Sequence, residues 1–262
     1  MGRRAASCRP EQPVLGHAAR AVGLLDTISM MQTASMGATA ETTTPRQARD
    51  NVWPAAFIAG GVLFLIGGPL HPSEDPGLPE AQATADMIGS TAWISSHSLL
   101  LLASIGFLIG LFALTRSRMP LSTAAQRAVL VAAIAGVLFV VEGVFHLAAF
   151  ADDDAARAGA ATPFLSTHMV MSLIVYPLFT FAVAALAVLS GRLLTHPAVG
   201  VIGAIGTVTF GLAPALVGLA GIESLDWMFP VGGILMALWF TVAGVTGLIR
   251  GSARRSAATS AR

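Results

Sequence analysis

Four of the six histidines in this 262-residue sequence stand at the ends of long apolar runs. His71 and His146 close two such runs, and His97 and His168 stand near the start of the runs that follow them. A carboxylate, Glu142, precedes His146 by four residues, which places both side chains on one face of a helix. Neutral imidazoles together with a carboxylate suit Zn, Cu or non-haem Fe. The pattern therefore predicts a metal site formed by His71, His97, Glu142, His146 and His168.

Two other interpretations of these histidines stay open. Rings near a membrane surface also serve as amphipathic anchors, in which case the chain would be a non-enzymatic scaffold or partner-binding subunit. A b-type haem between two histidines is a weaker alternative, favoured by the small residues Gly60, Gly61, Gly67 and Gly68. The same glycines are more typical of helix packing. The sequence leaves open whether a metal would serve redox chemistry, hydrolysis or metal handling.

Six apolar stretches must position these residues. Each is long enough to cross a bilayer, which needs about 20 mostly apolar residues. Because 55% of the chain is hydrophobic and only 11% is charged, the lipid bilayer is the expected surrounding. We predict an all-α integral membrane protein with six transmembrane helices and no separate soluble domain. The predicted helices span residues 52–70, 94–114, 128–150, 164–189, 198–220 and 228–249.

The sequence also contains an internal repeat. Residues 60–71 read GGVLFLIGGPLH and residues 135–146 read AGVLFVVEGVFH, so the two segments match without a gap and both end in His. The following helices correspond as well, with WISSH at 93–97 and FLSTH at 164–168. We therefore predict tandem helical-hairpin repeats from helices one and two and from helices three and four. Helices five and six would be a divergent third copy, in which Leu216 replaces the histidine.

Charged residues predict the orientation of the helices. All 15 basic residues are arginines, and beyond the first helix all but Arg157 lie in the second and fourth connections and near the C-terminus. Acidic residues occupy the other three connections, including a predicted solvated run, Asp152 to Asp154. The positive-inside rule then places both termini in the cytoplasm and the histidine cluster outward. Aromatic anchors fit this orientation, with Trp93 and Trp227 at the outer boundary and Trp53 at the inner one.

The remaining segments are polar. Residues 1–50 are predicted to form a disordered cytoplasmic tail, without an apolar run long enough for a signal peptide. Several methionines lie nearer the first helix, so residues 1–35 are expected to precede the true start of the protein. Residues 51–250 then form the six-helix domain and residues 251–262 a short cytoplasmic tail.

Composition narrows the partners and the source. A single cysteine, Cys8, excludes an intrachain disulfide and a cysteine-based metal site. The arginines segregate by helix connection, which favours the bilayer as partner and excludes nucleic acid, and protein partners stay open. An all-Arg composition rich in Ala and Gly is typical of high-GC bacterial genomes, so we expect a multi-pass protein of a bacterial plasma membrane.

Overall fold

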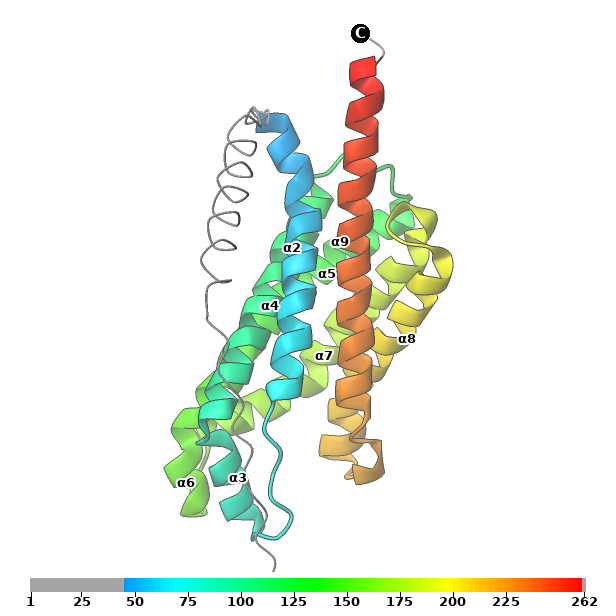
Figure 1. Ribbon diagram of the computed structural model, residues 1–262. Coiled ribbons are helices and arrows are strands. Elements are labelled where there is room, and N and C mark those ends of the chain that lie inside the picture. Colours follow the sequence, from blue (N-terminus) through cyan, green and yellow to red (C-terminus); the bar gives the residue numbers. More distant parts are fainter. Residues whose placement is uncertain (1–44, 261–262) are drawn as a thin grey trace, which may run out of the picture. The chain divides into compact units, whose positions relative to one another are not determined.

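Six long helices make up most of the described protein. The computed structural model describes residues 45–260, and every regular element in that range is helical (Figure 1). Six helices are long enough and apolar enough to cross a membrane, as hydropathy predicts. The predicted tail over residues 1–44, with the expected start, lies outside the described residues. The long helices are α2 (Pro45–Gly67), α4 (Thr91–Thr115), α5 (Thr123–Ala148), α7 (Pro163–Leu189), α8 (Pro197–Ala213) and α9 (Met228–Ser260).

Two of these helices run past the apolar stretches that predict them. Helix α2 begins at Pro45, inside the segment predicted to be disordered, and α9 continues to Ser260 through the predicted C-terminal tail. Hydropathy detects only the apolar part of a helix, whereas Arg, Gln and Ala continue a helix just as readily in water. The bundle therefore ends in helical extensions at the arginine-rich end.

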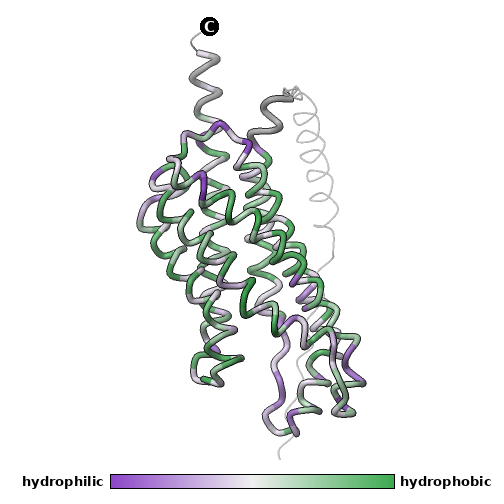
Figure 2. Tube along the Cα trace, turned by 180° about the vertical axis from the view of Figure 1, so that it is seen from behind, coloured by the Kyte–Doolittle hydropathy of each residue, from purple (hydrophilic) through white to green (hydrophobic). Residues whose placement is uncertain are grey.

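The long helices form a closed ring in chain order. Each packs against the preceding and the following long helix, and α2 packs against α9 to close the ring. Aromatic side chains fill its interior, where Phe107 stacks on Phe240 with ring centroids 4.1 Å apart and Phe139 stacks on Phe179 at 4.6 Å. Figure 2 shows hydrophobic residues along the helices and hydrophilic ones in the connections. This order places α4, α5 and α7 side by side.

Glycines allow close contact between α2 and α4. A Cβ atom added at Gly106 would lie 3.0 Å from the Cα atom of Gly60, so the two backbones touch there. A Cβ atom added at Gly67 would lie 2.9 Å from the Cβ atom of Leu99. Small residues commonly bring membrane helices together in this way. These glycines therefore serve helix packing, rather than making space for a haem.

Two short helices that hydropathy does not predict cover the acidic end of the bundle. They are α3 (Glu80–Ile88) and α6 (Asp153–Arg157), which follows the 3-10 helix η2 (Ala149–Asp152). Helices α3 and α6 pack against each other. Arg157, the lone arginine between α5 and α7, forms a 2.7 Å ion pair with Asp86 of α3. Pro79 and Gly89 on either side of α3 are the sequence signals for this helix.

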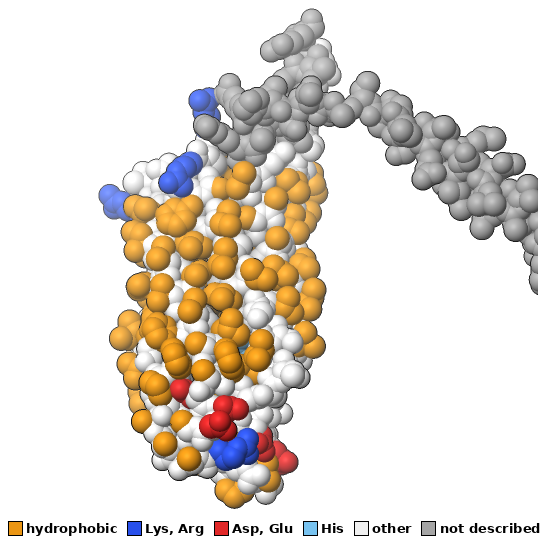
Figure 3. Space-filling model, turned by 90° about the vertical axis from the view of Figure 1, so that its left-hand side faces the viewer, with side chains coloured by type: hydrophobic (Ala, Val, Ile, Leu, Met, Phe, Trp, Pro, Cys, Tyr) orange, Lys and Arg blue, Asp and Glu red, His pale blue; other side chains and the backbone are white. Residues whose placement is uncertain are grey.

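The surface of the bundle is apolar between two charged ends. On the face drawn in Figure 3, a broad hydrophobic band lies between an end with basic side chains and an end where acidic side chains surround a basic one. Large side chains in the middle of the helices are exposed, among them Ile174 at 65% and Ile205 at 57%. A water-soluble protein rarely exposes so continuous an apolar surface. The six apolar helices fit a membrane protein.

Candidate metal centre

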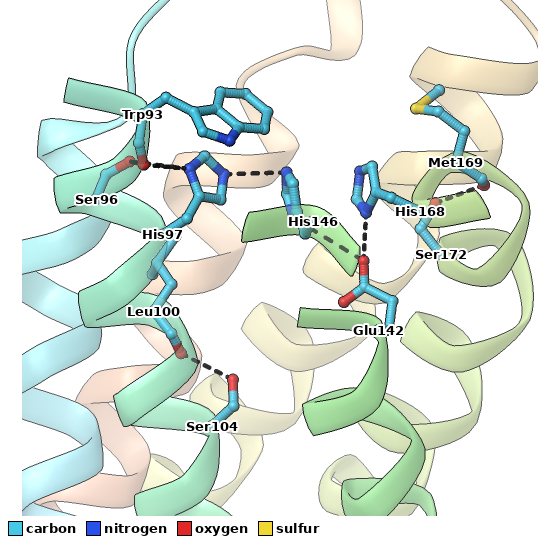
Figure 4. Close-up of polar contacts among 10 residues, drawn as sticks. All are labelled: Trp93, Ser96, His97, Leu100, Ser104, Glu142, His146, His168, Met169 and Ser172. Carbon is cyan, nitrogen blue, oxygen red and sulfur yellow. Dashed lines mark hydrogen bonds and ion pairs between the residues drawn. The ribbon is translucent and has the colours of Figure 1, made fainter. Parts of the chain in front are cut away.

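The four histidines and Glu142 lie together at the end of the bundle where α3 and α6 pack. His97 is in the second turn of α4 and His168 in the second turn of α7, while His146 is in the last turn of α5. His71 directly follows the 3-10 helix η1 (Gly68–Leu70) that ends the first span. Because α4, α5 and α7 are neighbours in the ring, their side chains meet in one layer (Figure 4).

His71, His97 and His146 form the first of two groups, called here the outer triad. One ring nitrogen from each lies within 4.8 Å of the others, and Nε2 of His97 is 3.0 Å from Nε2 of His146. The ring planes cross at 55° to 64°, so nitrogens on different rings can face a common centre. Two ligand nitrogens on one metal ion, each about 2.0 to 2.1 Å from it, are about 2.9 to 3.4 Å apart. The spacing of His97 and His146 fits this range.

Hydrogen bonds fix which ring nitrogens carry protons. Nδ1 of His97 lies 2.8 Å from the carbonyl oxygen of Trp93 and 3.1 Å from Oγ of Ser96. Nδ1 of His71 lies 2.6 Å from the carbonyl oxygen of Pro72. A carbonyl oxygen only accepts, so each Nδ1 must donate a proton and each neutral ring keeps a lone pair on Nε2. Metal-binding histidines are oriented by the same kind of bond.

His71 is the exposed member of the outer triad. Its ring lies against Trp93 and His97, with centroid distances of 5.5 and 4.8 Å. Desolvation lowers the pKa of His71 below its ordinary value of 6.5. The ring is therefore neutral at pH 7, which is the state that binds metals.

The second group consists of Glu142, His146 and His168. Glu142 is 1% exposed, and its Oε1 accepts a hydrogen bond from Nδ1 of His168 and lies 3.9 Å from Nδ1 of His146. The rings of His146 and His168 are stacked, with centroids 3.6 Å apart and planes inclined by 20°. Nitrogens of parallel stacked rings point in similar directions rather than toward one centre. This group therefore suits hydrogen bonding to a carboxylate better than shared ligation of an ion.

Side chains at two helix starts position the histidines. Oγ of Ser90 accepts a hydrogen bond from the amide of Trp93 and so caps α4 ahead of His97. Oδ2 of Asp152 accepts a 2.9 Å hydrogen bond from the amide of Leu165, in the first turn of α7. Asp152 is 3% exposed, so the prediction that it belongs to a solvated run is wrong for this residue. Its carboxylate is instead used to orient α7.

Trp93 belongs to the cluster, and its prediction as a boundary anchor is wrong. It is 2% exposed, stacks on His97 at 3.9 Å and contacts His146 at 5.2 Å. The signal for this was its spacing of four residues from His97, which puts both on one helix face. Trp53 is also buried, at 4% exposure, whereas Trp227 is 52% exposed as an anchor would be.

His97 and His146 lie too close together to be the two axial ligands of one haem. Two axial nitrogens on opposite sides of a haem iron would be about 4 Å apart, twice the metal–nitrogen bond length. Nε2 of His97 and Nε2 of His146 are 3.0 Å apart. No porphyrin fits between these two rings as they stand.

Comparisons with protein-family models, with curated proteins and with solved structures find no match. Fold and site alone therefore define the class of this protein. Over residues 45–260 it is all-helical, with six helices fit to cross a membrane, and its buried cluster of His and Glu could hold a metal ion.

Proposed function

We propose that this chain is a multi-pass membrane protein that binds one transition-metal ion, Zn, Cu or Fe, in the outer triad. The observation that carries the proposal is the arrangement of His71, His97 and His146. Two of these rings donate Nδ1–H to backbone carbonyls and keep Nε2 free, and Nε2 of His146 is 3.0 Å from that of His97. A neutral nitrogen set with crossed ring planes is what zinc, copper and iron sites use.

Glu142 supports this site as a hydrogen-bond acceptor for His146 rather than as a ligand. His97 carries its proton on Nδ1, so the proton between the two Nε2 atoms belongs to His146. That proton must leave Nε2 when a metal ion takes both nitrogens. The proton then moves to Nδ1 of the same ring, which is 3.9 Å from Oε1 of Glu142. The carboxylate stabilises the proton at that position. Carboxylate partners of this kind raise the basicity of a ligand histidine.

We further infer that the site faces outward from the plasma membrane, with both termini in the cytoplasm. The support is the separation of most arginines from the acidic residues across the hydrophobic band.

We also infer that the hairpin of α2 and α4 and the hairpin of α5 and α7 are tandem repeats. Phe64 and Phe139 are equivalent in the aligned segments, and both are buried in the core of the bundle.

Metal content of the purified chain tests the proposal. Wild-type protein isolated in detergent without chelator should contain about one equivalent of a transition metal, as one three-histidine site requires. His97→Ala and His146→Ala should each remove most of it. His196→Ala is the matched control, because His196 caps α8 through the amide of Ala198 and lies outside the cluster.

Metal-free wild-type protein after supplementation with Zn, Cu and Fe would refute the site. The site would also be refuted if the His146→Ala protein contained as much metal as the His196→Ala and wild-type proteins. The scaffold interpretation, in which the histidines are structural, would then stand. It predicts that His146→Ala changes thermal stability in detergent without changing metal content.

A further inference from the structure

The indole N–H of Trp93 is the unused polar group nearest to the outer triad. Trp93 is 2% exposed, and its Nε1 has no hydrogen-bond partner among the described residues. A buried N–H without a partner is energetically unfavourable, so such groups are rare in native proteins. The Trp93 ring contacts all three histidines of the triad, with centroid distances of 3.9, 5.2 and 5.5 Å.

The indole nitrogen is directed at the cluster. Figure 4 shows it on the edge of the ring that overhangs the gap between His97 and His146. The indole plane is inclined by only 30° to the His97 ring that it stacks on. An N–H bond lies in the plane of its ring, so the donor extends from the edge of the indole instead of pointing down onto the face of His97.

This inference rests on the proposed function. A zinc ion held by three protein ligands keeps a fourth position open for water or another ligand. An N–H donor beside a metal cation is unfavourable unless a group with a lone pair lies between them, because both carry positive charge. We propose that the open position takes a small anionic ligand, hydroxide in plain buffer, and that Trp93 Nε1–H donates a hydrogen bond to it.

The carboxylate of the cluster and the outer triad use different nitrogens of His146. Glu142 is the carboxylate of the cluster, and it faces Nδ1 of His146, whereas the triad uses Nε2 of that ring. His71 is exposed, so the outer triad borders water at this ring.

Azide binding to the cobalt-loaded, full-length protein tests the proposal. Azide is titrated in detergent and followed by visible absorption of Co(II), after metal content has been measured for each variant. Trp93→Phe keeps an aromatic ring over His97 but removes the donor, and should raise the Kd of azide about tenfold, as loss of a hydrogen bond to a charged group does. Trp239→Phe is the matched control, because Trp239 also has a buried, unpartnered Nε1 but packs on Phe240 in the core.

A second measurement covers the case in which Trp93→Phe folds poorly. In zinc-loaded wild-type protein labelled with 15N-tryptophan, azide should move the Trp93 indole N–H resonance, assigned by elimination with Phe variants of the other tryptophans. An unmoved resonance, or azide binding of equal strength in metal-replete Trp93→Phe protein, overturns the proposal. Wild-type protein that takes up no metal overturns the proposed function and this inference together, whereas normal metal uptake without azide binding overturns only the inference.

Discussion

At the scale of single residues, Glu142 is the point where the two aligned segments differ most in chemistry. The equivalent position in the first segment is Gly67, where an added Cβ atom would lie 2.9 Å from Leu99 and 3.1 Å from the carbonyl oxygen of Ser96. No glutamate side chain can be placed there without separating α2 from α4. Glu142 instead lies on α5, with His168 of α7 as its hydrogen-bond partner. Close helix packing thus explains why one hairpin carries a carboxylate and the other does not.

Replacing Glu142 by Gln separates the role of a charged hydrogen-bond acceptor from the role of ligand. Gln keeps the size and one acceptor oxygen but lacks the negative charge that stabilises a proton on Nδ1 of His146. Metal affinity, measured by competition with a chelator, should fall about 10- to 100-fold, as for other lost partners of ligand histidines. Protein at saturating metal should still bind one equivalent. A complete loss of binding capacity would mean that Glu142 is itself a ligand, and unchanged affinity would mean that it has no part in the site.

The sequence was sufficient to predict that five polar residues lie in one layer, but not how they divide. Depth follows from chain position along each helix, so His97, His146 and His168 could be placed at one level. Which nitrogens face each other depends on the rotation of each helix about its axis. That rotation decides that the ring of His146 stacks on His168 while its plane crosses that of His97 in the outer triad. Trp93 was missed because its type and position also fit a boundary anchor.

At the scale of elements, Asp152 links the short connection after α5 to the start of α7. Asp152→Ala would leave the partly buried amide of Leu165 without this partner and should lower the free energy of unfolding by about 1 kcal/mol. Asp152→Asn keeps an acceptor oxygen and should cost less. Thermal unfolding in detergent measures both, with Asp154→Ala as the control because Asp154 is exposed in the same connection. Equal stability of Asp152→Ala and wild-type protein would contradict this role.

The long helices could be predicted and the short ones could not, for a physical reason. A membrane-spanning helix is defined by a continuous apolar length, which is plain in the composition of each stretch. Helices α3 and α6 are short and combine charged residues with apolar ones, and they are held by packing on each other and on a small apolar cluster. The members of that cluster are Ala85, Ile88, Trp93, Ala149 and Ala156. Contacts between distant segments of this kind leave no periodic pattern in the sequence.

At the scale of the whole molecule, the orientation in the membrane decides which compartment the site meets. A reporter active only outside the cytoplasm should be active when fused after Asp154 and inactive when fused after Arg118, because arginines retain their connection in the cytoplasm. Fusion after Arg192 provides a second cytoplasmic point. Activity after Arg118 would reverse the assignment and place the histidine cluster on the cytoplasmic side.

The exposure of His71 has a consequence for how fast an ion can come and go. His97 and His146 are fixed on helices of the closed ring, whereas His71 follows the last turn of its span and begins a connection that reaches α3. When its ring swings away, it gives up its contacts with Trp93, His97 and His146, while the contacts between the long helices stay in place. In the proposed site, the metal ion can therefore be released to a chelator when this connection moves. Unfolding of the bundle is not needed. The lifetime of the bound ion is then governed by a loop, on a timescale far shorter than that of unfolding.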